Sequence, residues 1–124
     1  MRLLLDTHAL LALLSCDYPF SPQADEAMEQ ADTQLLLSVV SIWEIAIKRA
    51  IGKLTAPEDL LARIDETDTE MLTITARHAN AAGQLPLHHG DPFDRLLIAQ
   101  AKLEGCAILT RDRAFAAYGV PVVW

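Results

Sequence analysis

Short apolar runs most constrain how this chain can fold. Five segments of strand length contain no charged residue, and segments with helical signals separate them. Strands that are apolar throughout are typical of a parallel sheet covered by helices on both faces. The sequence therefore predicts an α/β fold, a three-layer α/β/α sandwich with a central, mainly parallel sheet. The expected strands are residues 3–5, 34–38, 71–74, 106–110 and 120–123.

Helix-start signals fill the segments between these strands. Ser21-Pro22 and Asp91-Pro92 each join a capping residue to a proline at the first helical position. Thr7 and Thr75 are further expected caps. The chain has 124 residues, the size of one hydrophobic core, so we expect a single domain over residues 1–124. The expected helices are about residues 7–15, 22–31, 41–50, 57–68, 75–83, 91–104 and 113–117.

Composition narrows the class of protein. A hydrophobic fraction of 52% excludes a disordered chain. Seventeen acids against ten basic residues give a net charge of −7, which argues against binding nucleic acid through a bulk positive field. Cys16 and Cys106 form no disulfide or zinc pattern, and we expect two reduced thiols. No apolar stretch approaches the roughly 20 residues of a membrane span, so a cytoplasmic protein is expected.

Two aspartates follow expected strands. Asp6 comes directly after residues 3–5, and Asp112 lies just beyond residues 106–110. Ligands of open parallel sheets bind outside the carboxyl ends of the strands, so both side chains are expected at that edge. Each aspartate also suits a helix N-cap, and for either residue alone both roles stay open.

Three further acids belong to expected helix starts. Glu44 lies three residues after Ser41, the spacing of a capping box, which is a complete structural explanation by itself. Asp91 is an expected N-cap, and Asp94 lies three residues on, so these two acids share one helix face. The first turn of a helix that follows a strand also faces the carboxyl edge, which adds a functional interpretation.

Taken together, these acids gather carboxylates from distant segments at one sheet edge. Like charges a few Å apart repel, so such a cluster needs a cation. Oxygen ligands without a thiolate favour Mg²⁺ or Mn²⁺ over zinc, and Mg²⁺ keeps positions open for a phosphate oxygen and a water. The sequence therefore predicts metal-assisted hydrolysis of a phosphodiester. It contains no P-loop, no G-x-G-x-x-G and no G-x-S-x-G motif.

Four motifs stand in order along the chain. They are Leu3-Leu4-Leu5-Asp6-Thr7-His8; Ser41-Ile42-Trp43-Glu44-Ile45-Ala46-Ile47-Lys48 with Gly52-Lys53-Leu54; Leu85-Pro86-Leu87-His88-His89 with Asp91-Pro92-Phe93-Asp94-Arg95; and Leu109-Thr110-Arg111-Asp112 with Tyr118-Gly119-Val120. The ordered set runs over nearly the whole chain. It resembles the PIN-domain ribonucleases, specifically the VapC-type toxins of bacterial type II toxin–antitoxin pairs.

This resemblance implies the roles of particular residues. In the family, the positions matching Asp6, Glu44, Asp94 and Asp112 form the metal-binding and catalytic cluster. We expect the three aspartates to ligate the metal and Glu44 to ligate it or to orient the water, while Asp91 is a ligand or only a cap. The resemblance further implies an endoribonuclease that depends on Mg²⁺ or Mn²⁺, an RNA substrate, a cognate antitoxin that occludes the site, and a homodimer.

Weaker signals surround the acids. Thr7 and Thr110 suit a hydrogen bond to a metal-bound water or a phosphate, although capping and strand ending explain them equally well. The two histidines at positions 88 and 89 are expected in a surface loop rather than in acid–base catalysis. Trp43 is expected in the core rather than stacked on a base.

Four basic residues are candidates for RNA contacts. Lys48, Arg49 and Lys53 form a cluster with no acid inside it, which suits either an RNA backbone or a solvated helix face. Arg95 suits a scissile phosphate or a salt bridge to the neighbouring acids.

Two other functions fit part of the pattern. An Mg²⁺-dependent phosphatase or phospho-acceptor domain uses an aspartate after the first strand. That chemistry calls for a second acid two residues after Asp6, or for a lysine after a later strand, and position 8 is histidine. A non-catalytic module could instead capture a basic partner segment in the acidic pocket.

Overall fold

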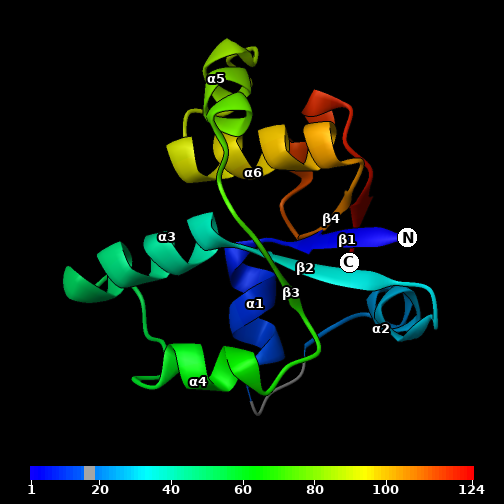
Figure 1. Ribbon diagram of the computed structural model, residues 1–124, viewed down its shortest axis with the longest axis vertical. Helices are drawn as coiled ribbons and strands as arrows, with labels where there is room; N and C mark the ends of the chain where they lie inside the picture. The colour runs from blue at the N-terminus through cyan, green and yellow to red at the C-terminus, as the bar shows by residue number, and fades with distance from the viewer. Residues whose placement is uncertain (16–18) are drawn as a thin grey trace.

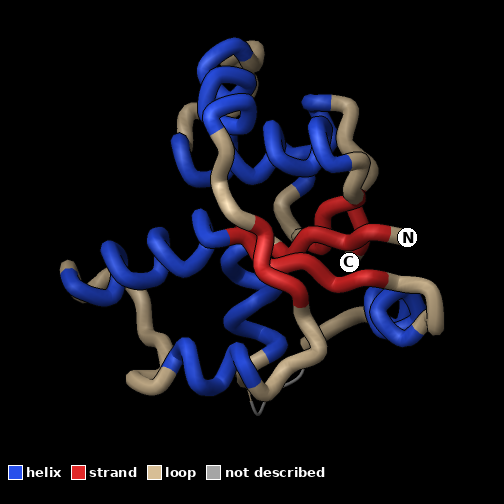
Figure 2. Tube along the Cα trace, viewed as in Figure 1, coloured by secondary structure: helices blue, strands red, loops and turns tan. Residues whose placement is uncertain are grey.

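Helices cover both faces of a parallel sheet in the computed structural model, which describes residues 1–15 and 19–124 (Figure 1; Figure 2). The strand order is β3-β2-β1-β4-β5, and every neighbouring pair is parallel. The expected three-layer fold is confirmed. In chain order the elements are β1 (Arg2–Leu5), α1 (Thr7–Leu13), α2 (Pro22–Glu29), β2 (Gln34–Ser38), α3 (Val39–Ala50), α4 (Leu60–Asp65), β3 (Glu70–Leu72), α5 (Ala76–Gln84), α6 (Pro92–Glu104), β4 (Ala107–Leu109), the 3₁₀ helix η1 (Arg113–Tyr118) and β5 (Val122–Val123).

The central strand β1 shows why the apolar runs make a covered sheet. Successive strand side chains point to opposite faces. Leu4 packs in a cluster with Ile98 of α6 and Phe115 of η1, whereas Leu3 and Leu5 pack toward α1 and α2. All three leucines are fully buried. In Figure 1, α5 and α6 lie above the sheet and α1, α2 and α4 below it.

The start of α3 differs from the expected one. The N-cap is Ser38, whose Oγ accepts the backbone N–H of Val40 at 3.0 Å. The expected capping box of Ser41 and Glu44 is therefore wrong. Strand β2 runs directly into the helix, so the cap is the last strand residue and Ser41 is buried in the first turn. Glu44 is consequently not engaged in capping.

The other helix caps are as expected, except that Asp6 takes the place of Thr7 as the cap of α1. The N-cap of α1 is Asp6, and Thr7 is the first helical residue. Gly105, at φ 68°, ends α6 in the left-handed region that favours glycine. The expected N-caps of α2, α5 and α6 are confirmed as Ser21, Thr75 and Asp91.

Several elements are shorter than expected. The helix expected over residues 57–68 is limited to α4, whose N-cap position, Asp59, makes no side-chain cap. The strand expected over residues 71–74 is β3, which begins one residue earlier, ends two residues earlier and pairs with Leu36–Ser38 of β2. Because β3 lies at the sheet edge, pairing stops where the chain turns toward the cap of α5. The strand expected over residues 106–110 is limited to β4 and is one residue shorter at each end. The strand expected over residues 120–123 is limited to β5, which begins two residues later.

A buried polar chain joins the start of α3 to α5 and α6. The Ser38 hydroxyl donates to Oε1 of Gln100 at 2.5 Å, and the Gln100 amide lies 3.3 Å from Nδ1 of His78. Nε2 of His78 lies 2.9 Å from Glu104. These contacts fix the point at which β2 becomes α3, directly behind the carboxyl edge.

Cys106 is a free, buried thiol whose pKa is raised by that burial, and the expectation for Cys16 falls outside the described residues. Across residues 1–15 and 19–124, every helix is too short or too polar to cross a bilayer.

Candidate active site at the carboxyl edge of the sheet

Asp6 is held rigidly at the end of β1. Its Oδ1 accepts the N–H of Ala9 at 2.7 Å, and its Oδ2 accepts the hydroxyl hydrogen of Thr110 at 2.5 Å. Its own N–H donates to the carbonyl of Leu109 on β4. The residue is 5% exposed, and burial raises the pKa of its carboxyl. Both roles considered for Asp6, cap and member of an acidic cluster, are therefore compatible in one side chain.

Glu44 reaches the same edge from the first half of α3. Its Oε1 accepts the hydroxyl hydrogen of Thr7 at 2.5 Å, and its Oε2 pairs with the ammonium of Lys48 one helical turn later. This hydrogen bond raises the pKa of Lys48. Glu44 is 3% exposed, so its carboxylate is buried, and the partly exposed Lys48 reaches it from the helix surface. Lys48 is thus not a lysine on a solvated face, because it pairs with an acid of the cluster.

The start of α6 contributes two acids. Oδ1 of Asp91 accepts the N–H groups of Phe93 and Asp94 at 2.8 and 3.2 Å. Burial, followed by the charge of Asp91, raises the pKa of Asp94 to about 7, and the charges of Glu44 and Asp6 act in the same direction. Among the described residues, Oδ1 of Asp94 and Oδ2 of Asp91 have no hydrogen-bond partner. Those two oxygens remain open to a cation.

Asp112 completes the cluster from the end of β4. It is the N-cap of η1, and its Oδ1 accepts the N–H of Ala114 at 2.9 Å. Its own N–H donates to the hydroxyl of Thr110 at 2.9 Å, and that hydroxyl donates in turn to Asp6. Asp6 and Asp112 line one pocket of about 390 Å³, together with His8, Ala12, Pro19, Arg111 and Trp124.

His89 lies inside the cluster, which sequence reasoning missed. Its Nε2 lies 3.0 Å from Oδ2 of Asp94 and 3.6 Å from Oδ2 of Asp112. One ligand atom from each of these three residues falls within 4.8 Å of the others, close enough to share an ion. His89 does lie in the loop that the sequence predicts. The only sequence signal for its place among the acids is its position two residues before the N-cap Asp91.

The sequence matches the family model of the PIN domain over residues 3–121. The chain belongs to the PIN domain family. A search of the curated proteins gave no match. The resemblance found in the motifs is thereby confirmed at the level of the family.

Solved structures show the same PIN fold. VapBC2 from Rickettsia felis, bound to a DNA fragment from its promoter, matches with a TM-score of 0.74 and 14% identity, covering 99% of this chain and 98% of that one. DNA-bound VapBC from Salmonella typhimurium matches at 0.72 and 19%, covering 99% and 97%. A toxin–antitoxin complex from Klebsiella pneumoniae matches at 0.64 and 22%, covering 98% and 95%.

The basic candidates of this PIN domain lie in different settings. Arg95 donates to four backbone carbonyls, those of Ala82, Leu85, Pro86 and His89, at 2.9–3.3 Å. Its guanidinium therefore fastens the end of α5 to the following loop, and its contact with a scissile phosphate stays a prediction. Among the described residues, Arg95 pairs with no acid of the cluster.

Two basic residues remain exposed at the far end of α3. Arg49 is exposed and donates to the carbonyl of Pro57 at 2.6 Å, and Lys53 is exposed as well.

The core position expected for Trp43 is wrong. Its side chain is 54% exposed and meets Phe93 edge-on with ring centroids 5.1 Å apart.

Proposed function

We propose that this PIN domain is a divalent-metal-dependent endoribonuclease. The observation that carries the proposal is the convergence of five carboxylates from four segments at one sheet edge, where open oxygens remain on Asp91 and Asp94. Membership of the PIN family supports nuclease chemistry, since that family consists of nucleases. The raised pKa of Asp94 supports a cation site, because burial and then the neighbouring acids oppose the charge of its carboxylate, and a bound cation would relieve that opposition.

The donor set fits Mg²⁺ or Mn²⁺. Its members offer carboxylate oxygens and no thiolate, the pattern that hard divalent cations prefer. The residues that would hold the ion are Asp6, Glu44, Asp94 and Asp112, with Asp91 as an additional oxygen. A bound ion supplies Lewis acidity for the phosphodiester and a more acidic water.

The chain's own residues prepare this chemistry. The hydroxyl of Thr110 donates to the carboxylate of Asp6 and accepts the backbone N–H of Asp112, and the hydroxyl of Thr7 donates to the carboxylate of Glu44. Lys48 places an ammonium at the outer oxygen of Glu44, where a phosphate of the substrate would approach. Fixed donors and acceptors of this kind favour a transition state because they need no rearrangement during the reaction.

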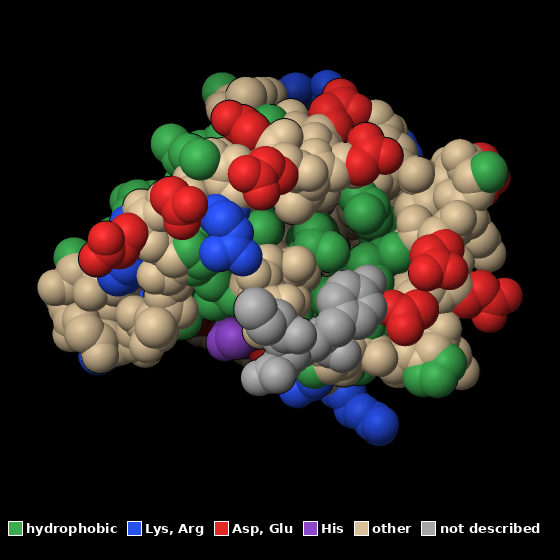
Figure 3. Space-filling view, turned by 90° about the horizontal axis from the view of Figure 1, so that it is seen from below, with side chains coloured by type: hydrophobic (Ala, Val, Ile, Leu, Met, Phe, Trp, Pro, Cys, Tyr) green, Lys and Arg blue, Asp and Glu red, His purple; other side chains and the backbone are tan. Residues whose placement is uncertain are grey.

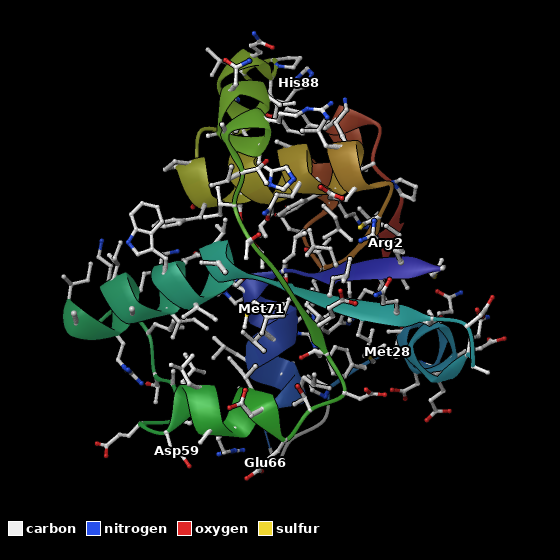
Figure 4. All side chains as sticks on the ribbon, viewed as in Figure 1. Arg2, Met28, Asp59, Glu66, Met71 and His88 are labelled. Atoms are coloured by element: carbon white, nitrogen blue, oxygen red, sulfur yellow. The ribbon has the colours of Figure 1, made fainter. Side chains whose placement is uncertain are left out.

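Charge distribution supports an RNA path past Lys48, Arg49 and Lys53. The part of the molecule that carries α2 and α4 is unsuited to a polyanion, because Asp and Glu side chains spread over it (Figure 3). Asp59 and Glu66 mark that acidic face at the two ends of α4 (Figure 4). Residues 58–70 contain six acids and one arginine. Local contacts, rather than a general positive field, would therefore bind the substrate.

The alternative functions fit the geometry less well. A phospho-acceptor aspartate needs a free, accessible oxygen for nucleophilic attack. Asp6 is buried, and both of its oxygens already accept hydrogen bonds. A non-catalytic acidic pocket has no need for hydroxyls that orient the carboxylates one by one, as Thr7 and Thr110 do.

Purified protein incubated with mixed RNA, with and without EDTA, tests the proposal. Cleavage that needs Mg²⁺ or Mn²⁺ and disappears in Asp94→Asn supports it. The matched control is Asp59→Asn, which changes an exposed acid directly before α4 and should cleave RNA normally. Phosphate release from small esters would indicate the phosphatase, and tight binding of a basic peptide without any cleavage would indicate the binding module.

We further propose that the chain is the toxin of a toxin–antitoxin pair, acts in the cytoplasm and forms a homodimer. The fold shared with toxin–antitoxin complexes supports the first part. An exposed apolar stripe along α3 supports the dimer, because Trp43, Ile47 and Ile51 recur every four residues on a helix that projects from the sheet (Figure 1). Arrest of bacterial growth on expression, reversed by the protein encoded by a neighbouring short gene, tests the toxin assignment.

A further inference from the structure

The loop before α6 is fastened around His89. The N–H of His89 donates to the Tyr118 hydroxyl at 2.7 Å, and that hydroxyl donates to the carbonyl of Pro86 at 2.9 Å. The carbonyl of His89 accepts from Arg95 at 3.3 Å. Tyr118 is buried, so its hydroxyl holds the loop from inside the fold. A loop residue fixed on both sides of its backbone has little freedom to move its ring away.

The tautomer of the His89 ring follows from its neighbour. The backbone N–H of Asp91 donates to Nδ1 of His89 at 3.1 Å. An atom that accepts this bond carries no hydrogen, so the hydrogen of the imidazole is on Nε2. Nε2 is the atom that faces Oδ2 of Asp94 at 3.0 Å and Oδ2 of Asp112 at 3.6 Å. His89 therefore presents an N–H, rather than a lone pair, to the two carboxylates.

Resting on the metal-dependent function proposed above, we infer that His89 is a positioning residue, which offers its Nε2–H to Asp94 and Asp112 and is not a metal ligand. A metal-binding Nε2 would need its hydrogen on Nδ1, where the N–H of Asp91 already points. The contact turns Oδ2 of Asp94 toward the ring and leaves Oδ1 for the ion. Groups behind metal ligands commonly orient them in this way, and losing one weakens metal binding.

Two amide variants separate the possible roles of the ring. In His89→Gln the amide nitrogen falls near the place of Nε2 and keeps a donor toward the acids. In His89→Asn the amide oxygen falls near the place of Nδ1 and keeps only the bond from Asp91. We expect the Mn²⁺ dissociation constant, measured by calorimetry, to stay within about threefold in the glutamine variant and to rise about tenfold in the asparagine variant. His88→Gln, one residue earlier and exposed, is the control and should not change it.

Two spectroscopic measurements test the tautomer without RNA cleavage. Imidazole ¹⁵N shifts of the metal-free protein should show the hydrogen on Nε2, and electron spin-echo spectra of the Mn²⁺-loaded protein should show no directly bound nitrogen. A hydrogen on Nδ1, a coordinated nitrogen, or an asparagine variant that outperforms the glutamine variant would each overturn the inference. If the unmodified protein binds no Mn²⁺, the proposed function fails instead, while the ¹⁵N shifts still decide the tautomer. Melting curves verify that each variant is folded.

Discussion

The hydroxyl of Thr110 donates to the buried Oδ2 of Asp6 at 2.5 Å and so ties the end of β4 to the end of β1. The hydroxyl oxygen of Thr110 also accepts the backbone N–H of Asp112 at 2.9 Å. One side chain thus sets the relation between two acids of the candidate site.

Thr110→Val keeps the shape of the side chain and removes this hydroxyl. Oδ2 of Asp6 then loses its hydrogen-bond partner in a buried place, which costs about 1–3 kcal/mol of unfolding free energy. We expect urea unfolding to show this loss and RNA cleavage to fall with it. Thr110→Ser, which retains the hydroxyl, should recover most of both; equal effects of valine and serine would contradict the assignment.

Asp94→Asn should have opposite effects on stability and on metal binding. Above about pH 7 the substitution removes a charge that burial opposes most and that Asp91, Glu44 and Asp6 also repel, so at that pH the metal-free protein should melt a few degrees higher, about what 1 kcal/mol produces in a small domain. Mn²⁺ affinity should fall at least tenfold, since removing even a group that only orients a metal ligand weakens metal binding by about that factor. Calorimetry and thermal unfolding of the same samples check both parts. A lower melting temperature without metal would show that Asp94 is structural.

The pKa of Asp94 gives a pH dependence with a definite sign. The folded protein holds this proton up to about pH 7, whereas the unfolded chain releases it near pH 4. The stability that the proton confers is therefore complete at low pH and lost as the pH rises through about 7. We expect the metal-free melting temperature to fall over this range more steeply than in Asp94→Asn. Saturating Mn²⁺ should reduce this difference in pH dependence between the two proteins. An equal fall of the melting temperature with pH in both would contradict the role given to Asp94.

Arg95→Met should loosen the loop that carries His89. Four carbonyls lose a charged donor, and the unfolding free energy should fall by about 2 kcal/mol. Arg77→Met, on the exposed face of α5, is the matched control and should be near neutral. Amide hydrogen exchange should rise at residues 85–90 in the first variant only. Unchanged exchange there would show that the loop is held by Tyr118 alone.

The apolar stripe on α3 predicts the oligomeric state. Ile47→Glu combined with Ile51→Glu should convert a dimer to a monomer, as measured by light scattering during gel filtration. Leu61→Glu on α4, where Leu61 is as exposed as Ile51, should leave the dimer intact. If the unmodified protein is already monomeric, or if the double variant still dimerises, the stripe serves another partner.

Much of this architecture was accessible from sequence because it follows from local patterns. Uncharged runs gave the strands, and the acids that follow Leu5 and Leu109 necessarily lie at the carboxyl edge of a parallel sheet. Proline-marked caps located α2 and α6. The start of α3 was missed because Ser38 is both the last strand residue and the cap, an overlap that a capping-box pattern at Ser41 concealed.

The remaining parts of the site depend on tertiary contacts that no spacing encodes. The approach of His89 to Asp112 requires Tyr118 to hold the loop, and the turning of Arg95 toward four carbonyls requires the end of α5 nearby. Lys48 pairs with Glu44 at ordinary helical spacing, so this contact could have been predicted. The exposure of Trp43 follows from α3 projecting beyond the sheet.

Pairing of the first strand with the fourth also has a consequence for the timing of synthesis. Thr110 and Asp6 are separated by 104 positions, and the two strands that carry them are neighbours only in the folded sheet. A ribosome must therefore translate past Asp112 before the acids can meet. The nuclease activity proposed above would therefore arise only once almost the whole chain has been made.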